Sequence, residues 1–393
     1  MPGDMSKYPA QYATPLLVRE VPVSIRHVLD TPALLVDMDI ARRNIAFMQR
    51  KADAAGVRLR PHTKTHRTPA LAAMQVAAGA QGITVAKIGE AEVMRDYGLD
   101  DIFIATVVMG EEKIRRLRAL AARARISIGV DQEEQIAALS GAFAGEAAPL
   151  DVLLEIETGE ARTGVLPGPD AARLAHCVQS APGLRLAGVF SHEGHCYGAP
   201  TAEACREMAL ESQRATMKAA DLIRRSGMPA DVVSIGATPS LLLAEILPGI
   251  TEIRPGTYIL MDAAQGAAVG SYAHCAATVL ATVTSKPAPG RVILDTGVKA
   301  LTAFTRPPGG ICATPGHGII KDLLPDIVRV NKLYDEHGII NDASAWEQLA
   351  LGDRVQVIPN HICPACNLYD EMHVMEQGVC VAVYPILCRG KSQ

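Results

Sequence analysis

Short apolar segments alternate with longer segments of helical periodicity from about residue 57 to residue 270. The longer segments are rich in alanine, and examples are Glu111–Arg123, Asp170–Ser180 and Ala202–Arg225. Eight strands joined by helices in this way predict a parallel (β/α)8 barrel. The predicted strands are Val57–Arg60, Ile83–Lys87, Ile102–Thr106, Ile126–Val130, Val152–Ile156, Leu186–Ser191, Val232–Ile235 and Glu252–Arg254.

The pattern changes on both sides of this segment. Before it, Ala33–Asp37 reads as an apolar strand and Ile40–Ala54 as an amphipathic helix, with a further candidate strand at Leu16–Val23. Since Ala33–Asp37 would be a ninth barrel strand, we assign it to another domain. After residue 270 the chain becomes strand-like, in CAATVLATVTSK, RVILDTG, DRVQVIP and GVCVAVYPIL. We therefore expect a barrel at residues 41–269 and a smaller, mostly antiparallel β domain formed by residues 1–40 and 270–393.

Composition narrows the class of protein. The chain has 393 residues, of which 49% are hydrophobic, and this is enough for a large core and two domains. Its net charge of -4 gives no reason to expect a nucleic acid or a membrane surface as partner. The sequence contains no signal-peptide pattern and no apolar run long enough to span a bilayer. Nine cysteines without framework-like spacing suit a reducing cytoplasm, so we expect a cytoplasmic protein.

The stretch Val57–Pro69 places a lysine between a strand and a helix. Pro61 ends the strand because it cannot donate to a β ladder, and Thr68-Pro69 has the signature of a helix start. Between them lies Lys64, flanked two residues away by His62 and His66. Burial or nearby cations would lower the pKa of this lysine and favour imine chemistry. The alternative is a solvated basic turn.

Further candidates lie where the predicted strands end, because barrel enzymes place their functional side chains at the carboxyl ends of the strands. The turns SIGATPS and RPGTY follow the last two strands and resemble a phosphate cradle, in which glycine allows close approach and amides and hydroxyls face the anion. A glycine alone marks only a turn. The strand-end candidates are Glu90, Arg162, His192, His195, Tyr197, Ser234, Gly236, Thr238, Gly256 and Tyr258.

A second centre is predicted near the C-terminal end. His361 and Cys363 alternate in PNHICP and would lie on one side of an extended segment. Both residue types ligate zinc, and two protein ligands would leave positions open for water and substrate, as in catalytic sites. Isolated His-x-Cys pairs also occur by chance. Cys366 completes a C-x-x-C with Cys363, which can indicate a redox pair, although no thioredoxin-like context accompanies it.

Taken together, RPHTKTH, SIGATPS, EIRPGTY, LDTGVKA, DEHG and PNHICPACNLYD resemble the D-serine dehydratase and D-threonine aldolase family. These are fold-type III pyridoxal-phosphate (PLP) enzymes related to the N-terminal domain of alanine racemase, and the resemblance runs from about residue 30 onward. It implies a PLP barrel with a β domain, active sites shared across a homodimer, and PLP bound to Lys64.

The resemblance also implies roles for individual residues. It places Arg162 near the PLP ring or its phenolate oxygen, with a structural ion pair as the alternative, and a divalent metal on His361 and Cys363. Zinc is expected, with manganese or magnesium as alternatives. His337, in DEHG, is expected near the metal or substrate, with a turn-stabilising histidine as the alternative, and Asp370 as support for the site. The phosphate is expected at Ser234, Gly236, Thr238, Gly256 and Tyr258, and His192 and Tyr197 are further cofactor-binding candidates.

Several functions are compatible with these residues. The first is a dehydratase that converts D-serine, D-threonine, 3-hydroxyaspartate or another β-hydroxy-D-amino acid to a 2-keto acid and ammonia. The second is retro-aldol cleavage to glycine and an aldehyde. His-x-Cys resembles the dehydratase branch, whereas the aldolase branch more often has His-x-Asp. A non-catalytic PLP carrier would lack the β domain and the metal pair, and a racemase would need a second base that we do not find in the sequence.

Overall fold

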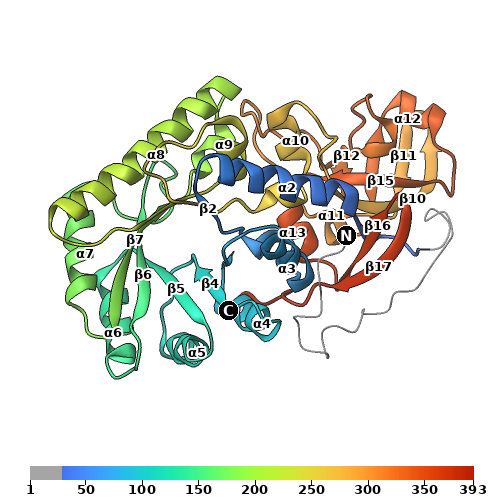
Figure 1. Ribbon diagram of the computed structural model, residues 1–393. Helices are drawn as coiled ribbons and strands as arrows, with labels where there is room; N and C mark the ends of the chain where they lie inside the picture. Colours follow the sequence, from blue (N-terminus) through green and yellow to red (C-terminus); the bar gives the residue numbers. More distant parts are fainter. Residues whose placement is uncertain (1–28) are drawn as a thin grey trace.

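A computed structural model describes residues 29–393, and in it the chain forms two β-sheets with flanking helices (Figure 1). The candidate strand Leu16–Val23 lies outside the described residues. Within residues 29–393 the structure contains no helix that is both long enough and apolar enough to cross a membrane. The two sheets correspond to the barrel and the β domain expected from the sequence.

The first sheet has eight parallel strands in the order β2-β9-β8-β7-β6-β5-β4-β3. A parallel bridge between His62 and Thr84 links the end of β2 to β3, so the ring is completed there. The (β/α)8 barrel predicted from the alternating pattern is therefore confirmed. Its strands are β2 Arg58–Leu59, β3 Ile83–Val85, β4 Asp101–Ile104, β5 Arg125–Val130, β6 Leu150–Ile156, β7 Leu184–Ser191, β8 Val232–Ile235 and β9 Glu252–Ile253.

Helices follow the barrel strands and bury one face on the sheet (Figure 1). α8 has the predicted bounds and buries a stripe of residues from Cys205 to Ile223. α2 begins two residues earlier than predicted, because the Asp37 side chain accepts a hydrogen bond from the Ile40 amide and caps it. The helices are α2 Met38–Ala54, α3 Pro69–Ala77, α4 Ile88–Asp96, α5 Glu111–Ala121, α6 Glu133–Phe143, α7 Pro169–Ser180, α8 Ala202–Arg225, α9 Thr238–Leu243 and α10 Ala263–Val269.

The second sheet is mixed and mostly antiparallel. β1 (Ala33–Asp37) belongs to it, pairing antiparallel with β10 and parallel with β16. The four predicted strand-like segments correspond to β10, β11, β15 and β17, whereas β12, β13, β14 and β16 were not predicted. The remaining elements are β10 Ala277–Ala288, β11 Arg291–Leu294, α11 Val298–Leu301, β12 Gly318–Ile320, β13 Lys332–Leu333, β14 Gly338–Asn341, α12 Ala343–Gln348, β15 Arg354–Pro359, α13 Ile362–Cys366, β16 Glu371–Glu376 and β17 Val379–Pro385.

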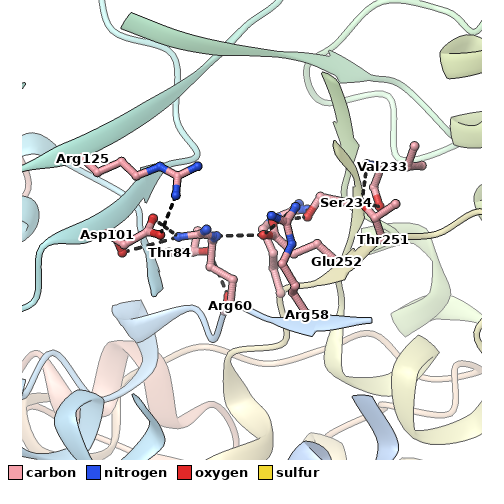
Figure 2. A network of polar contacts seen from close by, with 10 residues as sticks. Arg58, Arg60, Thr84, Asp101, Arg125, Val233, Ser234, Thr251 and Glu252 are labelled. Atoms are coloured by element: carbon pink, nitrogen blue, oxygen red, sulfur yellow. Dashed lines mark hydrogen bonds and ion pairs between the residues drawn. The ribbon is translucent and has the colours of Figure 1, made fainter. Parts of the chain in front are cut away.

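A buried ionic network links strands on both sides of the β2–β3 junction (Figure 2). The Arg60 guanidinium is 2.9 Å from Glu252 at the start of β9 and 2.6 Å from Asp101 at the start of β4. Glu252 also accepts a hydrogen bond from Ser234, at 2.7 Å. Burial alone would raise the pKa of Glu252, but the charge and hydrogen bond of Arg60, with Ser234 and Arg58, together outweigh it and hold the pKa below its ordinary value. Arg60 therefore neutralises charge where the barrel closes.

We expect Arg60→Leu to lower the free energy of unfolding by about 3 kcal/mol, because it leaves a buried carboxylate without its main partner. The matched control is Arg125→Leu. Arg125 contacts the same Asp101 at 3.6 Å, but its side chain is 67% exposed, and exposed pairs contribute little. Urea unfolding of both variants measures the difference. Equal midpoints for the two variants would show that the buried network does not stabilise the barrel.

Candidate active site

One cavity of about 770 Å³ lies at the carboxyl ends of the barrel strands and is also lined by the β domain. Side chains that are far apart in the sequence meet in it, including Lys64 after β2 and Cys363 after β15. Most of the candidates from the sequence line this cavity. They are Lys64, Arg162, His192, Tyr197, Gly236, Thr238, Gly256, His361 and Cys363.

Lys64 lies in a single 3-10 turn, Thr63–Thr65, directly after β2. Burial lowers the pKa of its ammonium, and the nearby charge of Arg162 lowers it further, while Cys363 opposes the shift. The pKa values of His62 and His192 lie well below their ordinary value, first through burial and then through the charge of Lys64. Both imidazoles are therefore neutral beside the amine. Burial, together with the charge of Arg162, makes Lys64 a better nucleophile than a solvated lysine.

Arg254 forms part of the cavity wall and was missed in the sequence, where RPGTY was read only for its glycine and hydroxyl. Its guanidinium lies 5.6 Å from the Phe103 ring and 5.1 Å from the Phe190 ring. It donates to Ser234 Oγ at 2.6 Å and to the Ser191 carbonyl at 2.8 Å. Two aromatic rings, a serine hydroxyl and a backbone carbonyl thus fix the Arg254 guanidinium in the cavity wall.

The turns after β8 and β9 face each other closely. A Cβ on Gly236 would lie 2.8 Å from the carbonyl carbon of Arg254, and one on Gly256 would lie 3.0 Å from Thr65 Oγ1. A Cβ does not fit beside the backbone at position 236, and at position 256 it would be a tight contact. Beside them, the buried hydroxyl of Thr238 lines the cavity and has no hydrogen-bond partner within residues 29–393. Glycine backbone and a free hydroxyl donor fit the phosphate of PLP.

Two other phosphate candidates do not face the cavity. Ser234 is fully buried, and its hydroxyl is held between Glu252 and Arg254. The Tyr258 hydroxyl accepts a hydrogen bond from Gln75 at 2.8 Å in the core, and burial raises its pKa. Their local sequence suggested strand-end hydroxyls, but Ser234 points at Glu252 and Arg254, and Tyr258 points at Gln75 of α3.

Arg162 has carboxylate neighbours as well as access to the cavity. Its guanidinium is 3.6 Å from Glu155 and 3.4 Å from Glu160, and the side chain is 48% exposed. Burial raises the pKa of Glu155, and Arg162 opposes this rise. Arg162 is therefore both an ion-paired residue and a cavity-lining residue.

The metal candidates lie at the start of α13. Of the two residues, only His361 is extended, because Cys363 lies in the helix Ile362–Cys366. The prediction that both lie on an extended segment was therefore wrong. Both side chains nevertheless line the cavity. Burial would lower the pKa of His361, but Cys363 and Asp262 outweigh it and raise the pKa to about 10. Burial would raise the pKa of Cys363, but His361 outweighs it and lowers the pKa to about 7.

Asp262, which the sequence analysis missed, supports this pair. It is fully buried, and its Oδ2 is 3.1 Å from His361 Nδ1. A carboxylate only accepts, so Nδ1 carries the proton and Nε2 is left as the ligand atom. With its raised pKa the ring also carries a proton on Nε2 when no metal is bound, and a zinc ion would displace that proton, so that the imidazole and the Cys363 thiolate fit zinc. Residues 29–393 contain no cluster of three or more His, Cys, Asp or Glu side chains that could hold a metal.

Other predicted residues lie away from the cavity. His337 is exposed in the turn between β13 and β14, so the expectation that it lies near the metal or substrate is not met within one chain. Asp370 is exposed and pairs with Arg389 at 2.7 Å. Cys366 is fully buried in the core, and burial raises its pKa. None of the three lines the cavity.

Two more strand-end candidates support neighbouring segments. Glu90 is buried and pairs with Arg67 at 2.9 Å, and Arg67 in turn lines the cavity. His195 lies behind the cavity, with Nε2 3.3 Å from Ser212 Oγ. Both residues therefore position structure around the cavity.

Comparisons with known proteins agree with this architecture. The sequence profile of the alanine racemase N-terminal domain matches residues 36–264, and that of the serine dehydratase domain matches residues 276–375. D-threonine aldolase of Arthrobacter sp is 34% identical over 368 residues, which cover 93% of this chain and 94% of that protein. D-threo-3-hydroxyaspartate dehydratase of Delftia sp. (strain HT23) is 36% identical over 352 residues, which cover 85% and 91%.

The Delftia enzyme also has solved structures. One aligns with a TM-score of 0.84 at 32% identity, covering 91% of this chain and 97% of that one. A cysteine-to-alanine variant of it was solved in a metal-free form, and a histidine-to-alanine variant was also solved. The two substituted positions are separated by one residue, as His361 and Cys363 are here.

The barrel, the second sheet and the shared cavity define a fold-type III PLP-dependent enzyme. The chain belongs to the family of PLP-dependent lyases that includes D-serine dehydratase, D-threo-3-hydroxyaspartate dehydratase and D-threonine aldolase.

Proposed function

We propose that the protein is a PLP- and metal-dependent dehydratase of β-hydroxy-D-amino acids such as D-serine, D-threonine or 3-hydroxyaspartate, which forms a 2-keto acid and ammonia. The observation that carries this proposal is the meeting of Lys64 with the His361–Cys363 pair in one cavity. Lys64 is close enough to Cys363 for their charges to affect each other's pKa. A proton acceptor and a metal pair in one cavity suit elimination of a β-hydroxyl.

The proposed cofactor site uses groups on the barrel side of the cavity. Gly236, Thr238 and Gly256 would hold the phosphate, since two glycine turns approach there and the Thr238 hydroxyl is free to donate. Lys64 would bind PLP covalently. When bound, PLP supplies an electron sink that acidifies the α-proton. Of the other cofactor-binding candidates, Arg162, His192 and Tyr197 line the same cavity and Ser234 and Tyr258 do not, although Ser234 helps to fix Arg254.

The protein's own residues would then transfer the protons of the reaction. Free Lys64 Nζ, with a pKa lowered by burial, would take the α-proton of the substrate. The neutral ring of His192 would remain fixed, because Nδ1 lies 2.6 Å from the Gly236 carbonyl. Lys64 would return this proton to the β-hydroxyl, which would leave as water at the side of the cavity where His361 and Cys363 lie. The released enamine would hydrolyse to keto acid and ammonia.

For the metal we propose zinc, with manganese or magnesium as alternatives. His361 Nε2 and Cys363 Sγ would be its protein ligands, and Asp262 would hold His361 in the required tautomer. A metal there supplies a Lewis acid for the β-hydroxyl. A soft thiolate favours zinc over the harder cations.

We also propose a cytoplasmic homodimer with shared active sites, and domain boundaries close to residues 41 and 270. In such a dimer the exposed His337 would reach the active site of the other subunit. This arrangement would reconcile the DEHG motif with the position of His337 outside the cavity of its own chain. Nucleic acid and membrane are not proposed as partners, given the net charge of -4.

Retro-aldol cleavage is the second candidate, supported by the similarity to D-threonine aldolase. It would need a base on the β-hydroxyl. Three histidines are candidates for this base, and of His192, His195 and His337 only His192 lines the cavity. Its pKa, well below the ordinary value, keeps it neutral but makes it a weak base for this step. A non-catalytic carrier is disfavoured because the chain has both the second sheet and the metal pair.

Products from a small substrate panel test the proposal. Purified protein with PLP and zinc is incubated with D-serine, D-threonine and 3-hydroxy-D-aspartate, and ammonia, keto acid, glycine and aldehyde are quantified. We expect ammonia and keto acid in equal amounts from at least one substrate, and no glycine. Glycine and aldehyde in equal amounts would instead establish the aldolase activity.

A further inference from the structure

Arg306 is a cavity residue that the proposed chemistry does not use. It lies in the loop between α11 and β12, part of the β domain, and faces the cavity together with Phe304. Within residues 29–393 its guanidinium has no ion pair and no hydrogen bond, and its Nε is buried without a partner. A buried donor without a partner is costly, so it indicates a group that binds there.

The other arginines of the cavity are already engaged. Arg67 pairs with Glu90 at 2.9 Å, and Arg162 lies near two carboxylates. Arg254 donates to a serine hydroxyl and a backbone carbonyl. Among the cavity-lining arginines, Arg306 is therefore the one whose donors are free for an anionic ligand.

Aromatic contacts fix the position of Arg306 relative to the metal pair. Its guanidinium lies 4.0 Å from the Tyr197 ring and 5.3 Å from the Phe304 ring. Phe304 in turn packs on His361, with 4.8 Å between ring centroids. Arg306 is thus separated from the metal ligand by one side chain, on a rigid aromatic support. Cation–π contact leaves the planar edge of the guanidinium, with its donors, open for a carboxylate.

We propose that Arg306 binds a carboxylate carried on Cβ of the substrate, so that the preferred substrates are β-hydroxy-D-amino acids with two carboxylates. This rests on the proposed function, in which the β-hydroxyl faces His361 and Cys363. A β-substituent then lies on the same side of the cavity as Arg306. Arginine recognises a carboxylate through two parallel hydrogen bonds, which a neutral methyl or hydrogen at that position cannot form.

Binding of two unreactive ligands of nearly equal shape tests this inference. D-aspartate and D-asparagine differ in the charge of the β-substituent, and neither carries a β-hydroxyl. Calorimetric titration of the PLP- and zinc-loaded protein should show that D-aspartate binds about tenfold more tightly or better. Arg306→Met should bring the two affinities to within about twofold of each other, and Arg306→Lys should retain part of the preference.

Arg115→Met is the matched control, since Arg115 is 67% exposed on α5 and its loss changes the net charge equally. It should keep the wild-type ratio of affinities. Equal loss of both ligands in Arg306→Met, an unchanged ratio in that variant, or no preference in the wild type would each overturn the inference. Because neither ligand can be dehydrated or cleaved at a β-hydroxyl, the result does not depend on which bond the enzyme breaks.

Discussion

Lys64→Ala is expected to lose turnover by about a thousandfold or more and to lose the visible absorption that borohydride removes from the wild type. The reason is the environment of the amine. Lys64 is the lysine that lines the cavity within residues 29–393, and burial lowers the pKa of its ammonium. Borohydride reduction of the yellow wild-type protein, followed by peptide mass mapping, should locate the pyridoxyl group on Lys64.

Lys218→Ala provides the control for this experiment. Lys218 is exposed on α8 and does not line the cavity, so its removal should leave absorption and turnover as in the wild type. Circular dichroism of Lys64→Ala should match the wild type and show that the barrel is intact. A Lys64→Ala protein that still gave a reducible chromophore would remove Lys64 from its proposed role.

Loss of the metal should have the next largest effect. We expect His361→Ala and Cys363→Ala to purify with little bound metal and to lose turnover by about a hundredfold or more, while PLP remains bound. The physical reason is that each variant removes one of two protein ligands. Chelation of the wild type should have the same effect, and zinc or manganese should restore the activity. Elemental analysis and the visible spectrum measure the two cofactors separately.

Cys366→Ala is the matched control for the cysteine. Cys366 is three residues from Cys363 but is buried in the core and does not line the cavity. This variant should keep the metal content of the wild type, with some loss of stability from the small cavity that it creates. Full activity in a sample that elemental analysis shows to be free of metal would exclude the metal from the reaction.

The barrel could be predicted because its strands are buried on both faces and read as continuous apolar runs. Val152–Ile156 and Leu186–Ser191 are examples, and both lie within longer strands of the structure. The β domain was harder. β13 has only two residues and β16 alternates exposed Glu371 with buried Met372, a pattern too short or too polar to distinguish from a loop.

Candidate site residues were found where a local motif carries the chemistry. Lys64 between two histidines and the His361–Cys363 spacing are of this kind. Arg254, Asp262 and Arg306 were missed because their positions depend on tertiary contacts. In the sequence, Asp262 resembles only a helix cap, a role it also has through the Gln265 amide.

Tertiary contacts also explain the candidates that do not reach the cavity. Ser234 lies in β8 and Tyr258 in the turn after β9, but their partners Glu252 and Gln75 hold them in buried positions. The sequence alone does not show whether a strand-end side chain points to the cavity or to the interior when hydrogen-bond partners are present on both sides. Gly236 depends less on side-chain direction, because a Cβ there would meet the Arg254 backbone, whereas Gly256 approaches the Thr65 side chain.

The most direct test of the account compares the rates of product formation from 3-hydroxy-D-aspartate with deuterium and with hydrogen on Cα. If Lys64 takes the α-proton before the β-hydroxyl leaves, deuterium should slow the reaction, and the products should be ammonia and a 2-keto acid. Stoichiometric glycine and aldehyde, with no ammonia and the same rate for both isotopes, would contradict the dehydratase assignment.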